Sequence, residues 1–288
     1  MLEKIGFIGL GTIGHHMAAA LVKGGYEVTV FDSEPTRVEA LTSIGGVAAP
    51  TAAEAARGRD LVISILSEGE EQGPLFCGET GIMAGIEPGT ILADMGTTSL
   101  ETTMQMAEET AKKRCYYIDA PVWGNKDHAA HGLLTIIVGG DPAIIGKCRE
   151  PFSKFGLNTI TVGEIGDATK MKFIVNMVQG TLVQVLAEGL VFGEKMGFEA
   201  EKILEVLDTR GVASPIFHLK GRAMSRNDFT RSLALKYVND GMHLVMNAAR
   251  LVGLQLPAAE AASKMYEKGV EAGFGEEDFS AVVKVLRK

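Results

Sequence analysis

The 288-residue sequence has few cysteines, a single tryptophan and no excess of positive charge. Cys77, Cys115 and Cys148 are odd in number and contain no C-x-x-C pair. They therefore indicate neither a disulfide framework nor a zinc site, no metal ligands are expected, and we expect each to be a small buried hydrophobe. With 28 Lys and Arg against 36 Asp and Glu, the net charge is −8. This argues against nucleic acid as a partner, because neutralising phosphates requires a basic surface.

Long apolar segments, internal repeats and low-complexity tracts are also lacking. No uninterrupted run of about 18 apolar residues occurs, and the N-terminus has the pattern of a strand rather than of a signal peptide. We therefore expect no membrane partner and a cytoplasmic location. The 46% hydrophobic and 22% charged residues are ordinary for a globular protein, and the length is sufficient for two domains.

The most informative segment is at the N-terminus. The apolar run Ile5–Ile8 leads into the G-x-G-x-x-G motif of Gly9–Gly14, and a second apolar run, Val28–Phe31, ends at Asp32. Such a motif between a strand and a helix, followed by an acid after the next strand, is typical of a dinucleotide site. The helix beginning near His15 would direct its N–H groups and positive dipole end at the phosphates.

The first part of the chain alternates short apolar runs with helical patterns. Such alternation indicates parallel βαβ units, hence an α/β fold with a doubly wound Rossmann sheet. We expect strands at residues 5–9, 28–31, 60–66, 90–94, 116–118 and 134–138. The last of these, within Leu133–Gly140, is expected to close the sheet at an edge, with an antiparallel orientation as one option.

The second part has helical periodicity. Apolar residues at helical spacing predict one helix from Ala168 to Met196, long enough to connect two domains, and further helices at residues 199–208, 232–252 and 257–272. We place a dinucleotide-binding domain at 1–163 and an all-helical substrate and oligomerisation domain at 164–288. Because the apolar helices exceed what a small domain can bury alone, we expect a homodimer or homotetramer.

A candidate acid/base group lies near the start of the long helix. Lys172 and Asn176 are four residues apart and so share one helix face. A lysine there can protonate a carbonyl oxygen as hydride arrives at carbon, and asparagine can orient the ammonium or the substrate. On spacing alone, Lys170 and Lys172 are equally consistent with solvent-facing charges.

Several segments resemble the β-hydroxyacid dehydrogenase family, which includes 3-hydroxyisobutyrate dehydrogenase and the glyoxylate and succinic semialdehyde reductases. The loop Gly9–Ala18 resembles the family's GLGxMGxxMA, Asp119–Val122 opens its DAPVSGG motif, and Gly166–Lys172 is similar to its GxGxxxK. The C-terminal Asp278–Ala281 is similar to the succinic and glyoxylate branch. The resemblance covers essentially the whole chain.

The resemblance implies the roles of individual residues. Lys172 and Asn176 would be catalytic. Cofactor contacts would fall on Gly9, Leu10, Gly11, Thr12, Ile13, Gly14, Asp32, Ser67, Thr97 and Asp240. Substrate contacts would fall on Val122, Trp123, Gly124 and Asn125.

Two positions depart from the family pattern. Trp123 replaces a small hydroxyl residue that would bind a substrate carboxylate, and its ring either fills the substrate end or packs in the core. The family's later Lys-Asp pair, aligned without a gap, falls on Asp240-Gly241, so that a cation has become an anion. Lys236, one turn earlier, is a candidate replacement for the missing charge.

The resemblance implies an NAD(P)-dependent oxidoreductase that reduces a small aldehyde or keto acid, or oxidises the corresponding hydroxyacid. Asp32 at the end of the second strand favours NAD, with NADP possible. Two alternatives remain open. An imine reductase could use a Trp face and a carboxylate to favour a cation, and a non-catalytic member could bind the dinucleotide as a structural or regulatory ligand.

Overall fold

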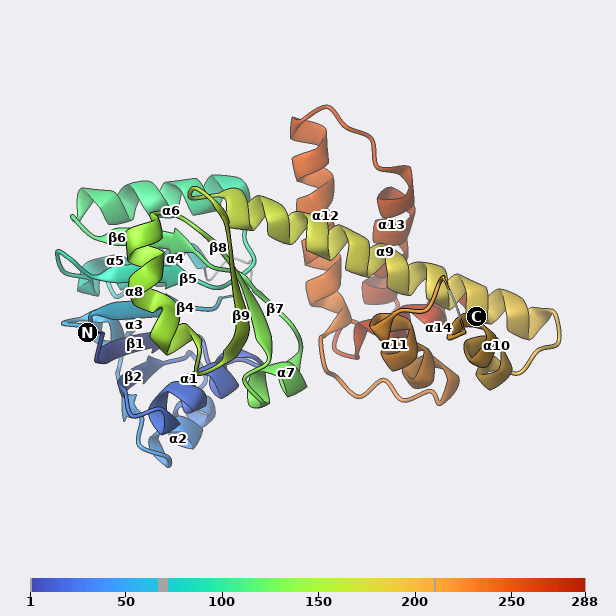
Figure 1. The fold of residues 1–288 in the computed structure, drawn as a ribbon, viewed down its shortest axis with the longest axis horizontal. Coiled ribbons are helices and arrows are strands. Elements are labelled where there is room, and N and C mark those ends of the chain that lie inside the picture. The colour runs from blue at the N-terminus through green and yellow to red at the C-terminus, as the bar shows by residue number, and fades with distance from the viewer. Residues whose placement is uncertain (1, 67–71, 210, 288) are drawn as a thin grey trace. The chain divides into compact units, whose positions relative to one another are not determined.

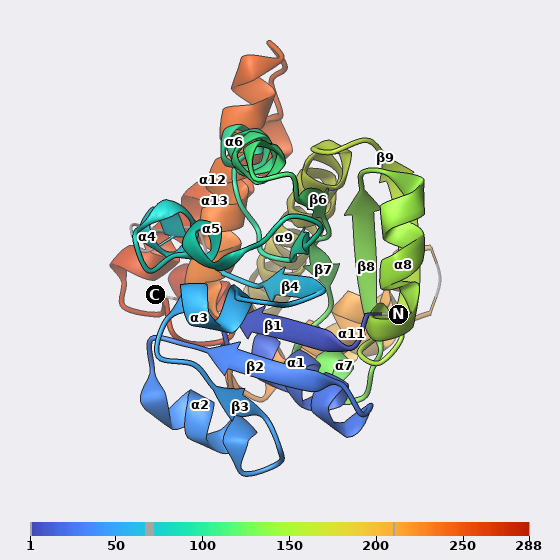
Figure 2. The same ribbon diagram turned by 90° about the vertical axis from the view of Figure 1, so that its left-hand side faces the viewer.

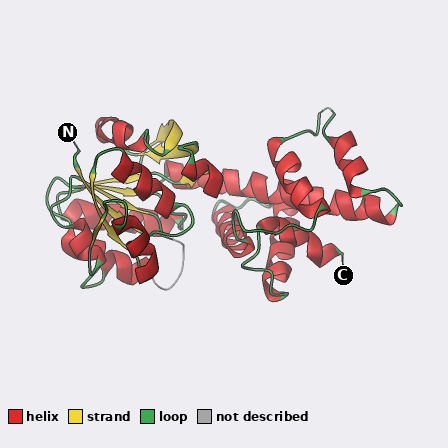
Figure 3. Ribbon diagram, turned by 90° about the horizontal axis from the view of Figure 1, so that it is seen from below, coloured by secondary structure: helices red, strands yellow, loops and turns green. Residues whose placement is uncertain are grey.

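The computed structural model describes residues 2–66, 72–209 and 211–287. The chain divides into two compact units, Met1–Lys172 and Phe173–Lys288 (Figure 1). Among the described residues, all strands lie in the first part of the chain, and the last of them ends at Gly163. Figure 3 shows the same segregation, with the strands gathered in the N-terminal unit.

The N-terminal unit is built on one mixed sheet. The strands are β1 (Lys4–Ile8), β2 (Glu27–Phe31), β3 (Val47–Ala48), β4 (Leu61–Ser64), β5 (Ile91–Asp94), β6 (Tyr116–Asp119), β7 (Val122–Trp123), β8 (Leu134–Gly139) and β9 (Gly156–Gly163). Their order is β3-β2-β1-β4-β5-β6-β8-β7, with β9 paired to β8. The first six strands are parallel neighbours, so the ends of β1, β4, β5 and β6 lie along one edge.

Helices cover both faces of this sheet (Figure 2). They are α1 (Gly14–Lys23), α2 (Pro35–Thr42), α3 (Ala52–Ala56), α4 (Gln72–Cys77), α5 (Ile82–Gly85), α6 (Leu100–Lys112), α7 (Lys126–Ala130) and α8 (Pro142–Phe152). One apolar core joins the sheet to α1, α7 and α8, and a second joins its other face to α3, α4, α5 and α6. The layers are those of a Rossmann fold, and the prediction of that fold is confirmed.

The expectation that all three cysteines are buried is wrong for one of them. Cys115 and Cys148 are buried, whereas Cys77 is exposed. Phe76 directs its ring into the core from the end of α4, and consecutive residues on a helix point about 100° apart, so its neighbour turns outward.

The six predicted strands are present, but the expected edge of the sheet is wrong. The segment Leu133–Gly140 contains β8, which is antiparallel to β6 and β7 and also pairs in parallel with β9 on its other side. It therefore lies inside the sheet. The strand β9 escapes prediction because its residues are mostly exposed or half-buried and lack a continuous apolar run.

The C-terminal part is helical. Its helices are α9 (Asp167–Lys195), α10 (Ala200–Leu207), α11 (Pro215–Ser225), α12 (Leu235–Leu251), α13 (Pro257–Glu271), the 3₁₀ helix η1 (Phe279–Val282) and α14 (Val283–Leu286). The predicted long helix is confirmed. By length and a mean hydropathy of 1.4, α9 could cross a membrane, but its Val183, Leu186 and Leu190 form part of the helical core.

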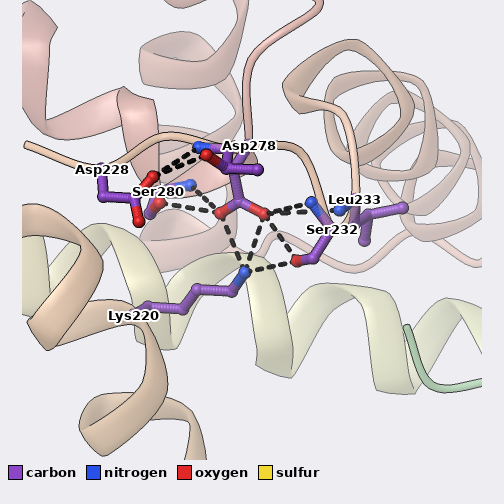
Figure 4. Close-up of polar contacts among 7 residues, drawn as sticks. Lys220, Asp228, Ser232, Leu233, Asp278 and Ser280 are labelled. Carbon is purple, nitrogen blue, oxygen red and sulfur yellow. Dashed lines mark hydrogen bonds and ion pairs between the residues drawn. The ribbon is translucent and has the colours of Figure 1, made fainter. Parts of the chain in front are cut away.

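A buried ion pair links three segments of the helical unit (Figure 4). The Lys220 ammonium on α11 donates to both carboxylate oxygens of Asp278, at 2.8 and 2.9 Å, and to Ser232 Oγ at 2.9 Å. Asp278 also accepts from the Ser232 and Ser280 hydroxyls. Both charged side chains are nearly inaccessible to solvent, so each depends on the other for its missing hydration.

Replacing Lys220 with Met should destabilise the protein by about 3–5 kcal/mol, because it leaves the Asp278 carboxylate buried without its counter-charge. Chemical denaturation measures this change. Lys264→Met is the matched control, since Lys264 forms an exposed pair with Glu260 on α13. Equal unfolding midpoints for the two variants would show that the buried Asp278 carboxylate does not depend on Lys220 for stability.

Candidate active site

The loop between β1 and α1 has the backbone that a dinucleotide site requires. Gly9 adopts a φ of +97°, a conformation that other residues rarely take, and a Cβ at Gly14 would lie 2.0 Å from the Gly9 carbonyl oxygen. By contrast, apart from Gly11 itself and its two chain neighbours, no described residue comes within 4 Å of a Cβ built on Gly11. The first and third glycines thus serve the turn and its packing. The second leaves open space beside the backbone, and the loop therefore fits a pyrophosphate.

Asp32 at the end of β2 is tied to this loop. Its carboxylate accepts hydrogen bonds from the backbone N–H of Leu10 at 2.6 Å and of Glu34 at 2.9 Å, and from Arg37 at 3.2 Å. Only 5% of its side chain is exposed. The Leu10 N–H is therefore directed at Asp32, and Asp32 positions the glycine loop as well as marking the expected ribose end.

The adjoining strand ends β4 and β5 are held together by Asp94. Its Oδ1 accepts from Ser64 Oγ at 3.0 Å and from the Gly96 N–H at 3.3 Å. Burial raises the pKa of Asp94 to about 6, against the opposing effect of these hydrogen bonds. The bond from the Gly96 N–H to Asp94 fixes the turn after β5, and the half-buried Thr97 follows that turn directly. Ser67, the other residue expected on the nicotinamide side, lies outside the described residues.

A second carboxylate fixes the start of α9. Asp119 ends β6, and its Oδ2 accepts from the Thr169 N–H at 2.9 Å and from Thr169 Oγ1 at 3.1 Å. Burial raises the pKa of Asp119, and the bonds from Thr169 partly oppose that effect. Since Thr169 is three residues before Lys172, this contact sets the position of the lysine. The sequence singles out the Asp119 motif but gives no signal of this partner.

Lys172 lies against the loop that follows Asp119. Its Nζ donates to the carbonyl oxygen of Val122 at 2.8 Å, and burial lowers the pKa of its ammonium to about 8. Lys170 instead forms an exposed ion pair with Asp167 at 2.9 Å. The structure therefore separates the two lysines: Lys170 is a surface charge, whereas Lys172 has the buried setting and near-neutral pKa suited to proton transfer.

The loop Val122–Asn125 carries the unusual tryptophan. Val122 and Trp123 form β7 and pair with Ile136 and Thr135 of β8. The Trp123 side chain is 46% exposed, so the alternative in which it packs in the core is wrong. Gly124 has a φ of +149°.

The same loop continues into α7 through a reciprocal cap. Asn125 Oδ1 accepts from the His128 N–H, and His128 Nδ1 accepts from the Asn125 N–H. His128 is not among the site residues expected from the sequence, because no common loop motif includes it.

In the helical unit, Asn176 of α9 lies against α12. A Cβ on Gly241 would lie 2.9 Å from Asn176 Nδ2, so this position of α12 faces the asparagine. Asp240 is half-buried, and burial raises the pKa of its carboxyl. Lys236 forms an ion pair with Glu276, and its charge also lowers the pKa of Asp240 against the larger effect of burial.

Comparisons with known proteins agree with this geometry. Residues 4–163 match the NAD-binding domain of 6-phosphogluconate dehydrogenase, and residues 166–286 match the NAD-binding domain of NADP-dependent 3-hydroxyisobutyrate dehydrogenase. The chain belongs to the β-hydroxyacid dehydrogenase family. Its cofactor is NAD(P), to which the glycine loop and Asp32 are suited.

The relatives include enzymes and one nuclear factor. Glyoxylate/succinic semialdehyde reductase 1 of Arabidopsis thaliana is 29% identical, covering 99% of this chain and 98% of the relative. The human cytokine-like nuclear factor N-PAC is 30% identical over 97% of this chain, which spans about half of that protein.

Solved structures share the fold. A 3-hydroxyisobutyrate dehydrogenase from Mycobacterium tuberculosis, described with L-serine, is 28% identical with a TM-score of 0.90 over the full length of both chains. An imine reductase from Myxococcus stipitatus, described with NAD⁺, has a TM-score of 0.66 at 20% identity, covering 99% of this chain and all of that chain, and shows the fold alone.

Proposed function

We propose that the protein interconverts a small aldehyde or keto acid and the corresponding alcohol or hydroxyacid, with Lys172 as the proton donor in reduction. The observation that carries this proposal is the half-buried Lys172, whose ammonium donates to the Val122 carbonyl and whose pKa is lowered by desolvation to about 8. The nicotinamide, when bound, supplies or accepts the hydride.

The chain's own groups have separate tasks in this proposal. Lys172 donates a proton to the carbonyl oxygen of the substrate, or removes it from the hydroxyl in the reverse direction. Asn176, one turn later on α9, orients the substrate oxygen, and the loop Val122–Asn125 holds the substrate. The Asp119–Thr169 contact restricts the first turn of α9, so that the lysine does not have to be ordered during the reaction.

Imine reduction on the same scaffold is the second candidate, favoured by the half-buried Asp240 at the position of a family cation. Such a carboxylate would attract a positively charged imine. A non-catalytic role is less well supported, because Lys172, unlike Lys220, has no carboxylate partner among the described residues to offset its desolvation.

Lys172→Ala should reduce turnover by about 10²–10⁴-fold with little change in NADH affinity, since the lost group acts on the proton and not on the cofactor. Steady-state rates with a panel of semialdehydes, α-keto acids and cyclic imines provide the measurement. Lys170→Ala is the control and should retain full activity, because Lys170 is on the surface. Similar losses in both variants would exclude this mechanism.

The rates measured in this assay should depend on pH. The protonated lysine is the acid in reduction, so the reductive rate should be constant below about pH 8 and fall above it, while the oxidative rate should rise over the same range.

For the cofactor, we propose NAD(H) in preference to NADP(H). Asp32 can accept from ribose hydroxyls and would repel a 2′-phosphate, and Arg37, the nearest cation downstream, already pairs with Asp32.

NADH should bind at least about tenfold more tightly than NADPH, the equivalent of ~1.4 kcal/mol. Asp32→Asn should reduce the difference in affinity between NADH and NADPH, because it removes the negative charge that would repel a 2′-phosphate. The amide oxygen can still accept a hydrogen bond from the Leu10 N–H, so the loop should be retained. Titrations of intrinsic fluorescence with both cofactors give the ratio. Asp60→Asn serves as the control, since Asp60 also accepts backbone N–H groups but at the start of β4. Tighter binding of NADPH by the unmodified protein would refute the preference.

We also propose that the protein is a homo-oligomer assembled through α9. An exposed apolar stripe follows one side of this helix, formed by Ile174, Val178, Leu182, Val185 and Phe192. Spacings of three, four and seven residues are those of a seam between helices, and a second copy offers the same stripe.

Val185→Glu should shift the protein toward the monomer, because it places a charge in the middle of the stripe. Light scattering coupled to size exclusion reports the mass. Val206→Glu changes an equally exposed valine on α10 and should leave the mass unchanged. A monomeric unmodified protein at micromolar concentration would disprove the assembly.

A further inference from the structure

A buried threonine of α6 reaches the first turn of α9. Thr103 is fully buried, and its Oγ1 lies 3.0 Å from Thr169 Oγ1. Its backbone N–H and its hydroxyl both lie within hydrogen-bond distance of the Ser99 carbonyl oxygen, at 3.0 and 3.1 Å. Because that carbonyl already accepts the helical N–H, the hydrogen of the Thr103 hydroxyl is available to Thr169.

The direction of this contact follows from the number of hydrogens. Thr169 Oγ1 donates to Asp119 Oδ2 over 3.1 Å, since an ionised carboxylate can only accept. A threonine hydroxyl has one hydrogen, so Thr169 accepts from Thr103. Tyr117, the other hydroxyl bonded to Thr103, is itself a donor and does not require the Thr103 hydrogen. The chain therefore runs from Thr103 through Thr169 to Asp119, and such buried chains strengthen their own hydrogen bonds.

Apolar contacts hold α6 and the start of α9 together at the same place. A Cβ built on Gly166 would lie 2.9 Å from Leu100 Cδ1 and 3.2 Å from Met104 Sδ. Leu100, Thr103 and Met104 are three and four residues apart and therefore share one face of α6. This face lies against the residues that begin α9, so packing as well as the hydroxyl directs Thr103 at Thr169.

The contact affects the proposed acid because Thr169 precedes Lys172 by three residues. The Thr169 N–H and hydroxyl both bond to Asp119. The Lys172 ammonium donates to the Val122 carbonyl at 2.8 Å, and desolvation lowers its pKa from 10.5 to about 8. This setting depends on the position of the first turn of α9, since a lysine that moves into solvent regains its ordinary pKa.

We propose that Thr103 is a positioning residue for the proton transfer: its hydroxyl holds Thr169 on Asp119 and thereby keeps Lys172 at the Val122 carbonyl. Thr103 acts through Thr169, from a helix that belongs to neither the glycine loop nor the loop after β6. The inference rests on the proposed function where it concerns catalysis. The placing of Lys172 by α6 can be measured without any substrate.

The test removes the Thr103 hydroxyl while nearly keeping the shape of the side chain. Thr103→Val replaces the hydroxyl with a methyl group, whereas Thr103→Ser keeps the hydroxyl and should restore the unmodified behaviour. Thr110→Val is the matched control, because Thr110 is equally buried on α6 but its hydroxyl donates to the Met106 carbonyl of the same helix. Tyr117→Phe removes the other hydroxyl beside Thr103 and leaves the contact with Thr169 in place.

The first readout is the ionisation of Lys172 without substrate, followed by NMR of ¹³Cε-labelled lysine during a pH titration. Lys172→Arg assigns the resonance. The pKa should be about 8 in the unmodified protein and in the Thr103→Ser, Thr110→Val and Tyr117→Phe variants. In Thr103→Val it should be higher by about one pH unit, a change equivalent in free energy to one hydrogen bond. An unchanged pKa in Thr103→Val, or an equal rise in Thr110→Val, would overturn the proposal.

Thr169→Val breaks the same contact from α9 and should raise the pKa of Lys172 by a similar amount. Combined with Thr103→Val, it should add little, because both substitutions remove one interaction. Full additivity of the two changes would overturn the proposal. If Thr103→Val does not fold, Thr169→Val decides alone, and an unchanged pKa of Lys172 in that variant has the same consequence.

The second readout is the reduction of succinic semialdehyde and of butanal by NADH. Thr103→Val should lower kcat about tenfold with an unchanged KM for NADH, because a displaced lysine impairs proton transfer and not cofactor binding. Thr103→Ser and Thr110→Val should retain kcat. A retained kcat in Thr103→Val would overturn the proposal. If no variant reduces either aldehyde, the proposed function fails, and the pKa values of Lys172 still decide the role of Thr103.

Discussion

The candidate site depends on the contact between the Asp119 carboxylate and Thr169. This carboxylate ends a central strand and accepts two hydrogen bonds from the first turn of α9. Because a helix is stiff, fixing its first turn also fixes Lys172 one turn later, against the loop that follows the same strand. The proposed acid and its loop thus have a common anchor. Burial strengthens these bonds, since the competing solvent is excluded.

Much of the fold follows from the sequence because it depends on local patterns. The glycine loop, the buried parallel strands and the long helix each have a periodicity or a steric requirement that a few neighbouring residues express. Pairings between distant segments have no such signature. The strand β9 escapes prediction because it is largely exposed, and the contact of Asp119 with Thr169 spans 50 residues.

In the candidate site as well, local patterns are visible in the sequence, whereas contacts between distant segments are not. Spacing alone does not distinguish Lys170 from Lys172, whereas burial does: one lysine pairs with Asp167 at the surface, and the other loses its solvent. The exposure of Trp123 depends on how the short β7 meets β8. The sequence marks His128 only as the fourth residue of a capping box whose acceptor is an imidazole instead of the usual Glu or Gln.

The close approach of Gly241 to Asn176 constrains how this sequence can change. A side chain at position 241 would meet the Asn176 amide, so a larger residue there requires that amide to turn. The neighbouring Asp240 already carries a side chain, which is half-buried. Position 240 thus already accommodates a side chain, whereas an acid at 241 also requires the asparagine to readjust.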